Sequence, residues 1–93
     1  MVKGAAKLTV HGTVQGVFFR QFVKENAEKL ELRGFVRNLD EGTVEIILEG
    51  DKEKILHMIE MVKKGPAHSQ IKNVGILEQK WSGEFKDFKI LRM

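Results

Sequence analysis

The sequence contains no cysteine and no long apolar run. Without cysteine the chain has no disulfide framework, no thiolate nucleophile and no cysteine-based zinc site. No stretch approaches the roughly 18 apolar residues of a membrane-spanning helix, and residues 1–6 lack the apolar core of a signal peptide. The sequence therefore predicts a cytoplasmic protein with no membrane partner.

A large excess of one charge sign is also missing, because 16 Lys and Arg face 13 Asp and Glu. Lysine and glutamate alternate along the chain, which is typical of solvated helix surface rather than of a basic patch. We therefore expect no nucleic-acid partner. Charged residues make up 31% of the chain, rich in lysine and glutamate, and this composition favours a heat-adapted source.

The length and composition indicate one compact domain. A chain of 93 residues can bury one two-layer core, and a hydrophobic fraction of 42% argues against disorder. No solenoid-length repeat or low-complexity tract divides the chain. We expect residues 1–93 to form a single domain and, since nothing in the sequence fixes the oligomeric state, a monomer.

Hydrophobic periodicity predicts seven secondary-structure elements. Gly12 predicts a bulge in the first strand, Gly34 a stop for the first helix, and Asp51 an N-cap for the second. The expected order is strand 8–14, helix 20–32, strand 34–40, strand 43–49, helix 51–64, strand 71–79 and strand 85–91.

This order predicts an α+β, ferredoxin-like sandwich, with an antiparallel sheet of four to five strands and two helices on one face. The period of a strand places Val36 and Asn38 on one face of their strand, and Phe35 and Arg37 on the other. The fold hosts many unrelated activities, so function must be argued from the site.

The most informative stretch leads from the first strand into the first helix. Gly12 and Gly16 lie four residues apart and precede Arg20. Glycines let successive N–H groups point into one concavity, a helix N-terminus adds donors, and a guanidinium group suits oxyanions. This pattern predicts a site for phosphate or a similar anion. Taken alone, a glycine pair beside an arginine more often marks an ordinary tight turn.

Three motifs in sequence order resemble those of one family. Residues 12–20, GTVQGVFFR, resemble the signature G-x-V-Q-G-V-x-[FY]-R of the acylphosphatases. Residues 34–38, GFVRN, are similar to the family's G-[WF]-V-x-N, and residues 40–45, DEGTVE, to its D-x-G-x-V-E. The resemblance extends from Leu8 to Ile90 and is to the small stand-alone acylphosphatases.

The resemblance implies metal-free hydrolysis of the carboxyl–phosphate bond of an acyl phosphate, with no cofactor. Arg20 would grip the phosphoryl oxygens, and Asn38 would position the attacking water. The backbone amides that would complete the cradle are those of Gln15, Gly16, Val17, Phe18, Phe19 and Arg20. In keeping with a metal-free site, His11, His57 and His68 are not at metal-ligand spacing, and we expect them at the surface or half-buried.

Some positions depart from the family or have a plainer interpretation. Where the family often has L-G-L at the end of the first helix, this chain has Leu30-Glu31-Leu32, so we expect a differently shaped helix end. Phe18, Phe19 and Phe22 are expected to be core or loop-anchoring residues, one of which could wall the pocket. Arg37 is expected to be a solvated edge charge.

Two other classes of function stay open. One is a small anion-binding module that keeps the cradle without turnover. The other is RNA binding on the sheet, which requires exposed aromatic side chains, and the expected central strand 43–49 has none.

Overall fold

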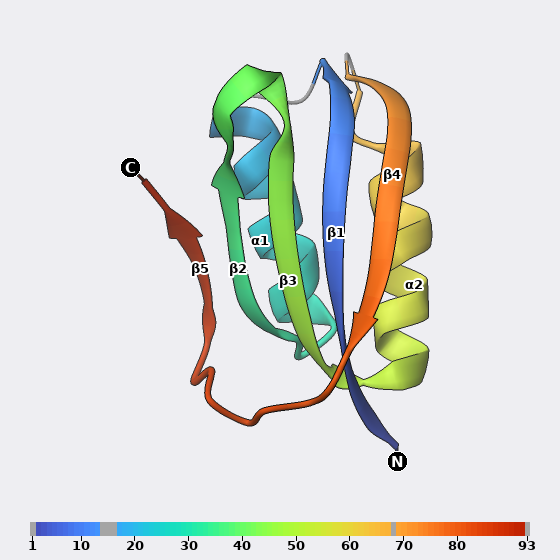
Figure 1. Cartoon of the computed structure of the whole chain (residues 1–93), viewed down its shortest axis with the longest axis vertical. Helices are drawn as coiled ribbons and strands as arrows, with labels where there is room; N and C mark the ends of the chain where they lie inside the picture. The colour runs from blue at the N-terminus through green and yellow to red at the C-terminus, as the bar shows by residue number, and fades with distance from the viewer. Residues whose placement is uncertain (1, 14–16, 68, 93) are drawn as a thin grey trace.

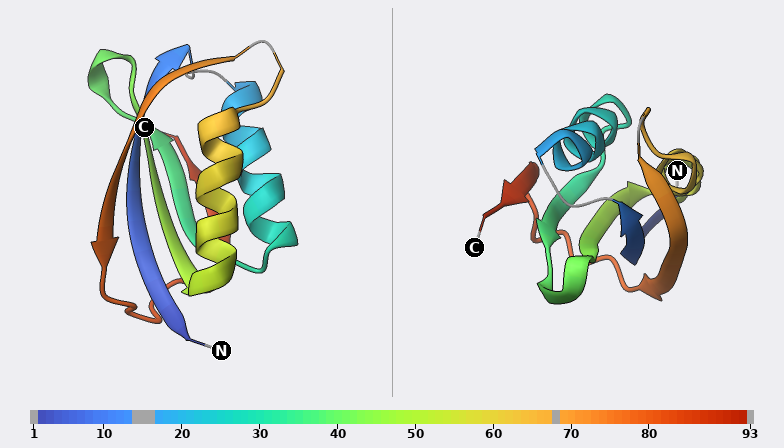
Figure 2. Two further views of the ribbon diagram at one scale, coloured as in Figure 1. Left: turned by 90° about the vertical axis from the view of Figure 1, so that its right-hand side faces the viewer. Right: turned by 90° about the horizontal axis from the view of Figure 1, so that it is seen from above.

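The computed structural model describes residues 2–13, 17–67 and 69–92. The strands and helices follow the predicted order, and both helices cover the same face of the sheet (Figures 1 and 2). They are β1 (Lys3–Thr13), α1 (Val17–Lys29), β2 (Arg33–Asn38), the 3-10 turn η1 (Asp40–Gly42), β3 (Val44–Asp51), α2 (Lys52–Lys64), β4 (Gln70–Gln79) and β5 (Phe88–Leu91).

The sheet has five strands in the order β4-β1-β3-β2-β5. The predicted antiparallel arrangement is confirmed for β1 to β4, whereas β5 runs parallel to β2. This difference arises because the segment 80–87 crosses below the sheet from one edge to the other (Figure 1). The buried Glu49 carboxylate anchors that segment by accepting hydrogen bonds from the N–H and hydroxyl of Ser82 and from the N–H of Gly83, at 2.7–3.0 Å.

The core lies between the sheet and the two helices. The strand periodicity is confirmed, because Val44, Ile46 and Leu48 are fully buried on the face that the helices cover. The apolar stripe of α2 is buried as well and consists of Ile55, Met58, Ile59 and Val62.

Local signals at the turns are confirmed at two places. Asp51 caps α2 by accepting from the N–H of Glu53 at 3.1 Å. The register between β1 and β4 shifts at His11 and Gly12, where the bulge was expected. Gly12 has a φ of 139°, and a Cβ there would collide with the Gln70 carbonyl, so this bulge requires glycine.

The end of α1 differs from the sequence prediction. The helix ends at Lys29 rather than near residue 32, and Gly34 lies inside β2, where a Cβ would collide with the Ile47 carbonyl. The Leu32 N–H donates to the Ala27 carbonyl at 2.8 Å, and the Glu31 N–H donates to the Glu28 carbonyl at 3.0 Å. These two bonds form a Schellman motif.

Glu31 occupies the position of this motif that glycine usually fills. Its φ is 58°, a left-handed conformation that strains a residue with a Cβ. Lys54 of α2 donates a hydrogen bond to its carboxylate at 2.8 Å, and this bond lowers the pKa of Glu31 and raises that of Lys54. The helix end therefore has the shape that glycine would give it, despite the different residue.

Two substitutions separate the backbone strain at Glu31 from the loss of its ion pair. Glu31→Gly and Glu31→Ala both remove the contact with Lys54, but only glycine relieves the left-handed strain. We expect Glu31→Gly to unfold about 5 °C higher than Glu31→Ala in thermal denaturation. Equal unfolding temperatures would contradict a strained backbone at this residue.

Candidate active site

Arg20 lies in the first turn of α1, which begins shortly after β1 ends. The helix is held against the sheet by Phe19, which is 4% exposed and packs near Phe22, with 6.2 Å between ring centroids. Arg20 itself is half-buried. Its guanidinium group is therefore carried by a well-anchored turn.

The described part of the predicted phosphate cradle coincides with the start of this helix. Val17 to Arg20 are the first four residues of α1, and the first four N–H groups of a helix have no acceptor within it. The first turn contains no acidic residue, so the positive end of the helix dipole and the arginine charge add together. Such an arrangement is typical of anion-binding sites in proteins.

The other cradle predictions have mixed outcomes. Gln15 and Gly16 lie outside the described residues. The expectation that Phe18 anchors the core or loop is wrong, because its side chain is 87% exposed. The reason is helical geometry: Phe19 faces the core, so its neighbour, about 100° around the helix, faces solvent.

Asn38 is the last residue of β2 and lies on the face that the helices cover, since Val36, two residues before it, is fully buried there. Asn38 pairs with Val44 of β3, and Val44 pairs with Val10 near the end of β1. The ends of β1 and β2 and the start of α1 thus lie at one end of the sheet (Figure 1). Arg20 and Asn38 share that end and that face.

The side chain of Asn38 contains an unusual buried acceptor. Its Oδ1 atom is shielded from solvent and has no hydrogen-bond partner among the described residues. A buried polar atom left without a partner costs about 1–3 kcal/mol, and most such atoms in proteins are paired. Asn38 therefore presents an acceptor suited to a donor that the described residues do not provide, such as a water molecule.

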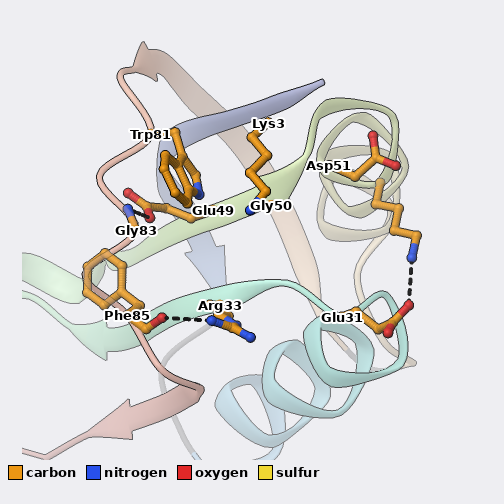
Figure 3. A pocket seen from close by; sticks show the side chains of 10 residues that line it. Lys3, Glu31, Arg33, Glu49, Gly50, Asp51, Trp81, Gly83 and Phe85 are labelled. Atoms are coloured by element: carbon orange, nitrogen blue, oxygen red, sulfur yellow. Dashed lines mark hydrogen bonds and ion pairs between the residues drawn. The ribbon is translucent and has the colours of Figure 1, made fainter. Parts of the chain in front are cut away.

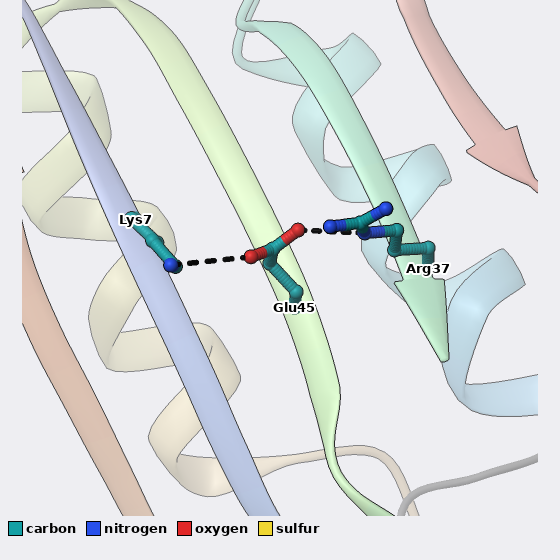
Figure 4. A network of polar contacts seen from close by, with 3 residues as sticks. All are labelled: Lys7, Arg37 and Glu45. Atoms are coloured by element: carbon teal, nitrogen blue, oxygen red, sulfur yellow. Dashed lines mark hydrogen bonds and ion pairs between the residues drawn. The ribbon is translucent and has the colours of Figure 1, made fainter. Parts of the chain in front are cut away.

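Arg37 points to the opposite face and takes no part in this site. Its Nε donates to Glu45 at 2.7 Å, and Lys7 contacts the other oxygen of the same carboxylate at 3.4 Å (Figure 4). The expectation of a solvated edge charge is therefore wrong, because Glu45, only 6% exposed, binds Arg37 across the hairpin. The pairing of positions 37 and 45 in the hairpin was the sequence signal for this contact.

A pocket of about 250 Å³ lies at the other end of the sheet (Figure 3). Its charged groups contact their neighbours: Lys54 binds Glu31 at 2.8 Å, Lys3 lies 4.6 Å from the Trp81 ring centroid, and Arg33 reaches the Phe85 carbonyl at 3.5 Å. Since these contacts hold the chain together at that end, we place the candidate site at the Arg20 end instead.

The histidines have the expected placement where they are described. His11 and His57 are exposed, and His68 lies outside the described residues. Within the described ranges, no three acidic, histidine or cysteine side chains gather as a metal site would require. None of the described helices has the length and apolar character needed to cross a membrane.

Comparisons of the sequence and of the structure with known proteins identify the family of the chain. A profile of the acylphosphatase family matches residues 6–90. The chain is 44% identical to an acylphosphatase of Pyrobaculum arsenaticum, over 98% of this chain and 97% of that protein. The acylphosphatase of Bacillus subtilis has the same fold, with a TM-score of 0.91 and 35% identity over 96% of this chain and 99% of that one.

A much longer protein also contains this fold. The crystal structure of full-length HypF in its phosphate- and nucleotide-bound form matches 98% of this chain at 36% identity and a TM-score of 0.88, but only 12% of HypF is covered. The profile and the full-length relatives together decide the assignment: the chain belongs to the acylphosphatase family.

Proposed function

We propose that the chain hydrolyses the carboxyl–phosphate bond of small acyl phosphates and that the Arg20 end of the sheet carries the reaction. Family membership supports an acylphosphatase activity. The observation that carries the assignment of the site is the buried, unpartnered Oδ1 of Asn38, which lies on the same face and at the same end as the start of α1.

In this proposal Arg20 and the backbone amides of residues 15–20 bind the phosphoryl group. The N–H groups at the start of α1 and the guanidinium fork supply donors to the phosphoryl oxygens. Each charge-assisted hydrogen bond contributes about 1.5–3 kcal/mol, so a few of them suffice to hold the group. Because these donors are fixed before substrate arrives, they stabilise the charge that develops on the equatorial oxygens.

Asn38 orients the attacking water. Its Oδ1 accepts a hydrogen bond from the water and directs the water oxygen toward phosphorus, in line with the departing carboxylate. A neutral amide suits this role because it adds no negative charge beside the phosphate. The carboxylate is a good leaving group, so the chain needs neither a strong acid nor a covalent nucleophile for the step.

The test is phosphate release from a panel of acyl phosphates, with a phosphate monoester as the matched control. We expect turnover of acetyl, benzoyl and carbamoyl phosphate and none of the monoester, because an alkoxide is a much poorer leaving group than a carboxylate. Phosphate binding without turnover of any acyl phosphate would contradict the proposal and favour an anion-binding module.

A further inference from the structure

The outer edge of β4 is a long strand edge with no partner in the described structure. β4 occupies one end of the strand order, and its residues 73–79 pair with β1 in unbroken register. Figure 1 draws no further strand on the other side of β4, and α2 lies behind that side. A long regular edge of this kind is a template for pairing with another strand.

Apolar side chains gather along this edge. Ile76 and Leu77 of β4 are 47% and 59% exposed, and Leu56 of α2 is 63% exposed. Leu56 and Ile76 line a shallow groove of about 170 Å³ between α2 and the sheet. Leu77 faces the opposite side of the sheet, because successive side chains of a strand alternate. Leu56 and Ile76 share one surface, and exposed apolar side chains that lie together mark an interaction site more often than scattered ones do.

No contact or backbone angle within the described residues requires glycine at Gly75, in the middle of β4. Its φ lies outside the left-handed region, and a Cβ there would make only ordinary contacts with Thr9, at 3.8 Å or more. Glycine weakens a strand interior and often marks the close approach of another backbone. The position therefore indicates that a neighbour from outside the chain approaches the strand here.

We propose that a second copy of this chain pairs with β4 in the antiparallel direction, with a two-fold axis at Gly75. The sequence around Gly75 is complementary to itself in this register. Lys72 lies opposite Glu78 of the second copy, and Val74 lies opposite Ile76. Because the axis is two-fold, each pair occurs twice.

The charges at the two ends of this register are available for such contacts. Lys72 and Glu78 are both exposed, and the ion pairs found among residues 2–13, 17–67 and 69–92 include neither of them. Pairing of two copies would give each charge a partner and would bring the apolar groove beside Leu56 next to its symmetry mate. The Arg20 end stays open, so this inference does not rest on the proposed function.

Sedimentation equilibrium of the full chain tests the proposal. The paired edge is smaller than a standard stable interface, so we expect a weak dimer with a Kd of about 0.1 mM. Association should weaken as NaCl is raised, since exposed ion pairs are screened. A parent protein that stays monomeric up to about 1 mM, ten times that Kd, would overturn the proposal.

Charge reversal tests the register. Lys72→Glu makes both ends of β4 acidic, and Glu78→Lys makes both basic, so each variant alone should raise the Kd about tenfold or more. An equimolar mixture of the two should form a heterodimer with a Kd close to that of the parent, because every opposed pair is again attractive.

Two controls carry the same charge changes away from β4. Lys86→Glu and Glu84→Lys alter exposed residues of the segment 80–87 and should leave the Kd unchanged. Thermal unfolding of all four variants checks that each is folded. The proposed pairing is wrong if the two β4 variants dimerise with the same Kd as their controls. It is also wrong if a mixture of Lys72→Glu and Glu78→Lys does not recover the parental Kd.

Discussion

Arg20→Ala is expected to abolish both turnover of acyl phosphates and binding of inorganic phosphate. The substitution removes the full positive charge from the first turn of α1 and leaves only backbone donors for the phosphoryl oxygens. We expect kcat/KM to fall by about a thousandfold or more. The measurement is steady-state phosphate release, with circular dichroism to verify folding because Arg20 is half-buried.

A matched pair of arginine-to-lysine substitutions gives the control. Arg20→Lys keeps the charge but loses the planar fork, so the rate should fall clearly. Arg37→Lys makes the same change on the opposite face, where the side chain binds Glu45 at 2.7 Å, and should keep the parental rate. If Arg20→Ala retained the parental rate, the assignment of the phosphate site would be wrong.

Asn38→Ala is expected to separate binding from catalysis. The variant should bind inorganic phosphate within about threefold of the parent, while kcat falls about a hundredfold because the attacking water is no longer oriented. Its thermal stability should not drop, because the substitution removes an acceptor that already lacks a partner. Steady-state kinetics, phosphate titration and thermal unfolding measure the three quantities.

Asn73→Ala makes the same change on β4 and serves as the control, because Asn73 lies next to Val74, which pairs with the buried Val10, and so faces away from the helices. It should keep the parental kcat. An Asn38→Ala protein that lost stability and phosphate affinity together would indicate a structural role for Asn38. Parental turnover would exclude the proposed orientation of water.

Local patterns predicted most of the fold. The cap at Asp51, the bulge at Gly12 and the buried stripe of α2 follow from neighbouring residues, and the structure confirms them. The end of α1 was misplaced because Gly34 resembles a helix stop. In the structure the strained Glu31 takes the left-handed position. Gly34 lies in β2, where glycine is needed because a Cβ would collide with the Ile47 carbonyl.

Long-range contacts were beyond such patterns. The parallel direction of β5 depends on a segment that Glu49 anchors from more than thirty residues away. The burial of Glu45 between Lys7 and Arg37 depends on three strands meeting on one face.

The candidate site was predicted in part. Family resemblance singled out Arg20 and Asn38, and strand parity placed Asn38 on the same face as Val36, which the structure shows to be the face that the helices cover. No pattern in the sequence indicated that the Asn38 oxygen would be buried without a partner, because that depends on everything packed around the end of β2.

The most direct test of the division of roles is the titration of inorganic phosphate into the parent, Arg20→Ala and Asn38→Ala proteins by calorimetry. If Arg20 binds the phosphoryl group and Asn38 acts on water, phosphate affinity disappears in the first variant and persists in the second. Equal loss of affinity in both variants, or undiminished affinity without Arg20, would contradict the account.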